Sequence, residues 1–65
     1  MKAKTIIYLG QNEKLRSPDG MIEVLKALDA IADINGTVML NRLTDHGTVK
    51  HVFLPKPNIV RLEDA

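Results

Sequence analysis

The stretch TVMLNRLTDHGTVKHVFL, residues 37–54, decides the fold because it places two apolar runs on either side of a short turn. Asp45-His46-Gly47 is typical of a three-residue hairpin loop, in which a type I turn ends in a glycine with left-handed backbone conformation. We therefore predict an antiparallel hairpin in which Thr44 faces Thr48.

This register determines which side chains share a face of the hairpin, because alternate residues of a strand point to opposite sides. The first face pairs Val38 with Leu54, Leu40 with Val52, and Arg42 with Lys50. The second face pairs Met39 with Phe53, Asn41 with His51, and Leu43 with Val49. Both faces are largely apolar, so the hairpin needs two covers. One helix supplies one of them, and the other is either the rest of the chain, folded as a small barrel, or another subunit.

A helix is predicted between residues 17 and 36. Ser17 is placed to cap its first turn, and Pro18 suits the first helical position because its missing N–H would be unpaired there. Asn35-Gly36 is typical of a helix end. The expected buried side of the helix is formed by Met21, Val24, Leu25, Leu28, Ile31 and Ala32. Ile22 falls beside the polar side, which makes it a candidate for a second contact.

The remaining segments predict strands at both ends of the chain. The run KTIIYLG, rich in β-branched residues, predicts a central or doubly buried strand that ends at Gly10. Residues 11–16 are polar and predict a loop. In FLPKPNIV, residues 53–60, the two prolines end the hairpin ladder at Pro55 and turn the chain toward a last strand at residues 58–62. The expected fold is a single α+β domain, residues 1–65, with strand and helix order β-α-β-β-β and a mostly antiparallel sheet or small barrel packed on the amphipathic helix.

Size and composition favour self-association. A chain of 65 residues buries a modest share of its surface, and with no cysteine it has no disulfide to compensate. Its hydrophobic content of 45% is generous for a chain that must also cover itself with polar groups. We therefore expect a homo-oligomer.

Charge and hydropathy narrow the possible partners and location. The net charge is +1 and both signs are mixed along the chain, so no basic or acidic run marks a nucleic-acid or membrane partner. The apolar run at residues 6–9 is too short for a signal peptide or a membrane span, and the expected location is the cytoplasm.

No set of residues predicts catalysis, a metal site or a cofactor site. The chain has no cysteine nucleophile, its only serine is expected to act as a cap, and its two histidines are set apart on a loop tip and a strand. The expected function is that of a non-catalytic, self-associating regulatory module that acts through protein contacts. The predicted interface is the second face of the hairpin together with the helix, namely Met39, Asn41, His51, Phe53 and Ile22.

The alternative function is binding of nucleic acid through the hairpin tip. Arg42 and Lys50 face each other near the tip, and Lys56 and Arg61 follow in the sequence, so the four could form a basic ridge that contacts phosphates. Aromatic side chains for base stacking are nearly absent, which makes this the second choice.

The closing segment VFLPKPNIVRLE resembles the second signature segment of Sm-like RNA-binding proteins, in which an apolar strand, a short break and a second strand follow one another. The resemblance covers about a fifth of the chain. It departs from the family at Pro55-Lys56, where an Arg-Gly is expected, and in having a strand before the helix. We therefore infer no membership in that family.

Overall fold

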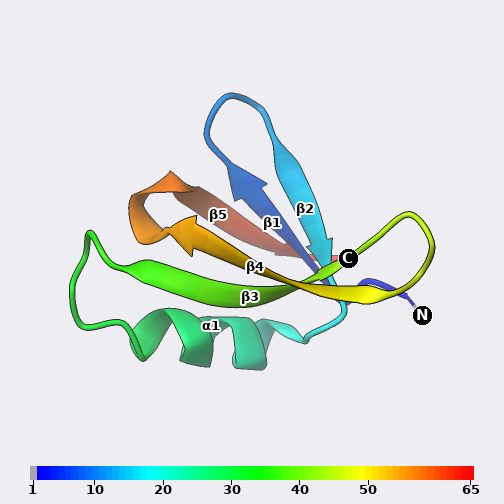
Figure 1. Cartoon of the computed structure of the whole chain (residues 1–65), viewed down its shortest axis with the longest axis horizontal. Coiled ribbons are helices and arrows are strands. Elements are labelled where there is room, and N and C mark those ends of the chain that lie inside the picture. The colour runs from blue at the N-terminus through cyan, green and yellow to red at the C-terminus, as the bar shows by residue number, and fades with distance from the viewer. Residues whose placement is uncertain (1) are drawn as a thin grey trace.

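The computed structural model describes residues 2–65 and shows a small α+β domain with five strands in two sheets and one α-helix (Figure 1). The elements in chain order are β1 (Thr5–Leu9), β2 (Lys14–Ser17), α1 (Met21–Asp29), β3 (Thr37–Leu43), β4 (Val49–Pro55), the 3-10 helix η1 (Lys56–Asn58) and β5 (Ile59–Asp64). The first sheet has the order β2-β1-β5, and the second consists of β3 and β4. All strand pairs are antiparallel.

The predicted hairpin is confirmed in every pair of its register. Val38 lies opposite Leu54 and Met39 opposite Phe53, and the pairing continues to Leu43 opposite Val49. Gly47 has a φ of +78°, and its N–H donates to the Thr44 carbonyl at 3.0 Å, as the expected type I turn requires.

β1 is the central strand of the first sheet, as predicted, because β2 pairs with one of its edges and β5 with the other. The pairing of β5 with β1 shows that the last strand returns to its own chain. The prolines do end the hairpin, since β4 stops at Pro55 and the chain turns through η1 into β5.

The order β-α-β-β-β is wrong in one element, because residues 14–17 form a strand where a loop was expected. The chain reverses at Gln11 and Asn12, which have φ of 65° and 63°, so that β2 can pair with β1. Leu15 and Ser17 point inward from this strand while Lys14 and Arg16 remain exposed. One inward leucine in four residues left too weak a pattern to identify the strand.

The helix is shorter than predicted at both ends. It begins after Gly20, with no side-chain cap, because Ser17 is the fully buried last residue of β2. The Ser17 hydroxyl accepts a hydrogen bond from the Asp19 N–H at 3.2 Å and so stabilises the turn into the helix instead of capping it. The helix ends at Asp29, and the segment that follows turns through a hydrogen bond from the Asn35 N–H to the Asp33 carboxylate.

The core lies between the two sheets, with α1 running along β3 (Figure 1). Its buried members are Ile7, Leu15, Val24, Val38 and Leu40. Val52 and Leu54 pack against it, so the apolar pairs of the first hairpin face are covered from within the chain. The strands form two separate sheets among residues 2–65, so a closed barrel is not shown. Leu25, predicted to be buried, is 46% exposed because Val24 occupies the core position of that turn.

Candidate functional site

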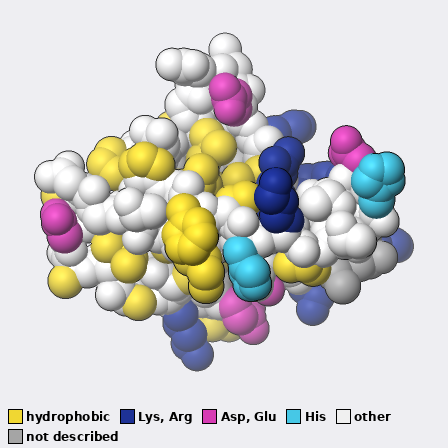
Figure 2. All heavy atoms as spheres, in the orientation of Figure 1, with side chains coloured by type: hydrophobic (Ala, Val, Ile, Leu, Met, Phe, Trp, Pro, Cys, Tyr) yellow, Lys and Arg dark blue, Asp and Glu magenta, His cyan; other side chains and the backbone are white. Residues whose placement is uncertain are grey.

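The second face of the hairpin carries the largest side chains that the fold leaves uncovered on a sheet. Met39 is 50% exposed and its cross-strand partner Phe53 is 69% exposed. Figure 2 shows hydrophobic side chains at the surface over β4, next to a histidine. Burial of such a pair of side chains would be favourable by about 1.5–3 kcal/mol for each one fully covered. This face is therefore the strongest candidate for a contact with another molecule.

Asn41 and His51 form the next pair along this face, as predicted from the register. The Asn41 amide donates from Nδ2 to the Asp19 Oδ2 at 2.9 Å, which fixes the orientation of the amide. His51 is exposed and lies on β4, which among residues 2–65 pairs with β3 alone. On this face His51 therefore lies next to the Asn41 amide, whose orientation is fixed, and next to the aromatic side chain of Phe53.

Asp19 is a part of this site that the sequence did not point to. Its carboxylate holds Asn41, its N–H donates to Ser17, and its carbonyl accepts a hydrogen bond from the Thr5 hydroxyl at 2.8 Å. Asp19 thus connects three strands: it bonds to Thr5 of β1, to Ser17 at the end of β2, and to Asn41 of β3. The only sequence signal for such a partner was Asn41 itself, because a polar side chain in the middle of an apolar face needs a hydrogen-bond partner.

A hollow of about 450 Å³ lies beside the Asn41–Asp19 pair. It is open to solvent, and it is lined by Lys2, Lys4, Pro18, Asp19, Asn41 and Val49. Because Val49 and Asn41 belong to the second face, the hollow extends that face toward the N-terminal end of the chain. Among residues 2–65 no group of three or more histidine, aspartate or glutamate side chains gathers in a way that could hold a metal ion.

The helix residue predicted to join this interface, Ile22, lies in the first turn of α1 and is 66% exposed. Ile34, beyond the end of the helix, is 72% exposed. Both side chains thus lie outside the core, and the exposure of Ile22 agrees with its expected position beside the polar side of the helix.

The four predicted basic residues do not form one ridge. Arg42 and Lys50 are both exposed and lie opposite each other on the hairpin. Lys56 lies beyond the other end of β4, and its Nζ donates to the Ile31 carbonyl at 3.0 Å. Arg61 is in the other sheet, where its guanidinium lies 3.9 Å from the centre of the Tyr8 ring and 2.9 Å from a Glu63 carboxylate oxygen.

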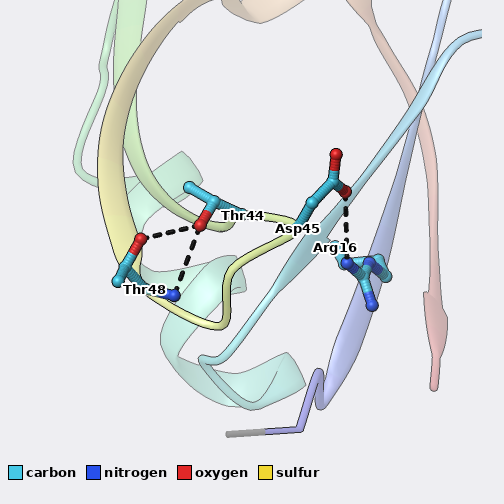
Figure 3. A network of polar contacts seen from close by, with 4 residues as sticks. All are labelled: Arg16, Thr44, Asp45 and Thr48. Carbon is cyan, nitrogen blue, oxygen red and sulfur yellow. Dashed lines mark hydrogen bonds and ion pairs between the residues drawn. The ribbon is translucent and has the colours of Figure 1, made fainter.

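The hairpin tip is held by local polar contacts (Figure 3). The Thr44 and Thr48 hydroxyls are 2.7 Å apart, and the Thr44 N–H donates to the Thr48 carbonyl at 2.9 Å. The Asp45 carboxylate lies 3.9 Å from the Arg16 guanidinium of β2, so the two sheets also meet at this end. His46, beside Asp45, is exposed on the loop.

Comparison with models of known protein families, with curated proteins and with solved structures finds no match to this chain. No helix among residues 2–65 has the length and apolar character needed to cross a membrane.

Proposed function

We propose that this chain is a small, non-catalytic module of the cytoplasm that associates with itself and acts through protein contacts. The observation that supports this proposal is the exposed Met39–Phe53 pair, which lies on a regular sheet. An exposed apolar patch with polar neighbours is typical of a protein–protein contact site.

The chemistry of the face favours a protein partner. It combines an aromatic ring and a methionine with one oriented amide and one imidazole, and aromatic and methionine side chains are enriched at protein interfaces. Hydrogen bonding of Asn41 to Asp19 leaves the amide oxygen of Asn41 available as an acceptor for a partner group. A contact made through this face would have an apolar centre, formed by Met39 and Phe53, and polar groups at its rim, from Asn41 and His51.

The test is light scattering of the purified chain over a range of micromolar concentrations, with Phe53→Ser and Val60→Ser as a matched pair. Phe53 and Val60 are 69% and 65% exposed, but Val60 lies on β5, outside the second face. We expect the wild type and Val60→Ser to have a mass above 7.2 kDa and Phe53→Ser to approach that monomer mass. A wild-type monomer at every concentration would refute self-association.

A second candidate function is binding of nucleic acid through the paired cations Arg42 and Lys50. The observation in its favour is that no ion pair to either side chain is found within residues 2–65, and both are exposed at the same level of the hairpin. This function predicts that the wild type binds mixed oligonucleotides at low salt, and that the affinity falls with added salt. The variant Lys50→Glu should lose this binding. No retention of the wild type at low salt would rule it out.

A further inference from the structure

The outer edge of β4 is a second exposed feature, distinct from the apolar side chains of the same strand. β4 pairs with β3 on one side, and their sheet contains no third strand among residues 2–65. The N–H and C=O groups on the other side of β4 therefore have no strand to pair with. Such an edge is a template for pairing with another chain.

Two hydrogen bonds show which residues of β4 present their backbone groups at this edge. The Thr44 N–H donates to the Thr48 carbonyl at 2.9 Å, and the Lys56 N–H donates to the Gly36 carbonyl at 2.8 Å. Both bonds continue the hairpin register, and in an antiparallel pair every second residue bonds to the partner strand. Even-numbered residues of β4 therefore bond to β3, and Val49, His51 and Phe53 direct their N–H and C=O groups outward.

Pro55 marks the end of this outward ladder. It is the next odd-numbered residue of β4, opposite Thr37, so its missing N–H removes no bond to β3. On the outer edge of β4, however, Pro55 has no N–H to donate to a neighbouring strand. Only Val49, His51 and Phe53 can thus form complete outward pairs.

We propose that the outer edge of β4 pairs antiparallel with the same edge of a second copy of this chain, with His51 on the two-fold axis. This inference rests on the self-association proposed above and specifies its geometry. His51 then pairs with His51 of the second copy, and Val49 pairs with Phe53 of the second copy. The two hairpins become one four-stranded sheet with about six new backbone hydrogen bonds, two for each of the three pairs.

The neighbouring antiparallel registers are less favourable for identifiable reasons. A shift in one direction places Lys50 opposite Lys50 of the second copy, and like charges directly opposite each other are destabilising. A shift in the other direction places Val49 opposite Pro55, which has no N–H to donate. In the proposed register Lys50 lies opposite Val52, and no proline is needed as a donor.

The proposed register also covers apolar surface. Residues that form a pair across two strands have their side chains on the same face, so Phe53 lies beside Val49 of the second copy. These side chains are 69% and 43% exposed in the single chain. The second faces of both copies then form one continuous surface across the two-fold axis.

Single cysteines provide the test, because the chain has none of its own. In H51C the two thiols lie on the axis with Cα atoms about 5.5 Å apart, within the range of a disulfide. In V49C, the matched control, each thiol is four residues along the strand from its symmetry mate, about 13 Å away. We expect H51C to form a disulfide-linked dimer on mild oxidation of the folded protein and V49C to remain mostly unlinked.

Each outcome has a defined meaning. If the wild type self-associates but H51C is linked no faster than V49C, the edge pairing is wrong while self-association stands. Preferential linking of K50C or V52C to itself would show one of the shifted registers and also refute this geometry. If light scattering shows a wild-type monomer, both proposals fail. Light scattering of reduced H51C checks that this substitution itself preserves the assembly.

Discussion

Asp19 connects three segments of the chain through three different groups. Its carboxylate accepts from Asn41, its N–H donates to Ser17, and its carbonyl accepts from Thr5. The carboxylate bond is partly buried, so its loss is not fully compensated by water. We infer that this residue holds the start of α1 against the second face of the hairpin.

Removing the side-chain bond should destabilise the fold measurably. We expect Asn41→Ala to lower the free energy of unfolding by about 1 kcal/mol, because a partly buried carboxylate loses its amide donor. Urea denaturation measures the change, and a double-mutant cycle with Asp19→Ala isolates the pair. Asp45→Ala is the control, because the Asp45–Arg16 contact is exposed and 3.9 Å long, and it should change the stability little. Additive effects of the two single substitutions would contradict the proposed coupling.

Gly36 is required by a close approach. A Cβ atom at this position would lie 2.5 Å from the Ile31 Cγ2 and 3.0 Å from the Asp33 carbonyl oxygen. We expect Gly36→Ala to lower the free energy of unfolding by about 1–3 kcal/mol, the usual range for overpacking. Gly10→Ala is the matched control, since a Cβ there meets no atom within 4 Å. Thermal unfolding of the two variants, followed by circular dichroism, should separate them, and equal melting temperatures would contradict the packing around Gly36.

At the scale of elements, the hairpin of β3 and β4 was predictable in full because several signals agreed. The Asp45-His46-Gly47 turn determined the loop type and with it the register, which the structure reproduces pair by pair. A shift of one residue would have moved the buried Val38 and Leu40 to the outside. The exposed Met39–Phe53 pair of the candidate site follows from the same pattern.

The start of α1 was not predictable from its local sequence. Ser17-Pro18 is a strong helix-start signal, but burial of Ser17 in β2 and its bond to the Asp19 N–H use the serine elsewhere. Pairing of β2 with β1 depends on the turn at Gln11 and Asn12, whose left-handed backbone has no glycine to indicate it. Asp19 was missed as a member of the site for the same reason, since its partner Asn41 is 22 residues away in the chain.

Neighbouring residues of β3 should respond in opposite ways to truncation. Leu40 is 3% exposed in the core, so Leu40→Ala should lower the free energy of unfolding by about 2–5 kcal/mol. Met39 is 50% exposed on the second face, and Met39→Ala should cost less than about 1 kcal/mol in dilute solution. Chemical denaturation at low protein concentration makes the comparison. Similar losses for both variants would contradict the assignment of the two faces.

At the scale of the whole molecule, the fold buries Val38 and Leu40 of the first hairpin face and leaves Met39 and Phe53 of the second face open. Leu43, the member of the second face next to the turn, is buried. The first face closes over Ile7 and Leu15 of the other sheet together with Val24 of α1. Residues 2–65 contain no second α-helix that could cover Met39 and Phe53. A small domain with a limited core gains stability from association that covers exposed apolar side chains such as Phe53.

Self-association therefore predicts a stability that depends on concentration. Because only the folded chain associates, the melting temperature of the wild type should rise as the protein concentration is raised. Phe53→Ser should have a melting temperature that is nearly independent of concentration, and Val60→Ser should behave like the wild type. Differential scanning calorimetry at several concentrations makes this comparison, and a wild-type melting temperature that stays constant would count against a stabilising assembly.

Sedimentation velocity of the wild-type chain, from low to high micromolar concentration, measures directly whether the chain associates with itself. Self-association predicts a reversible shift from a species of 7.2 kDa toward one of twice that mass as the concentration rises. A single species of 7.2 kDa across the whole range would contradict it.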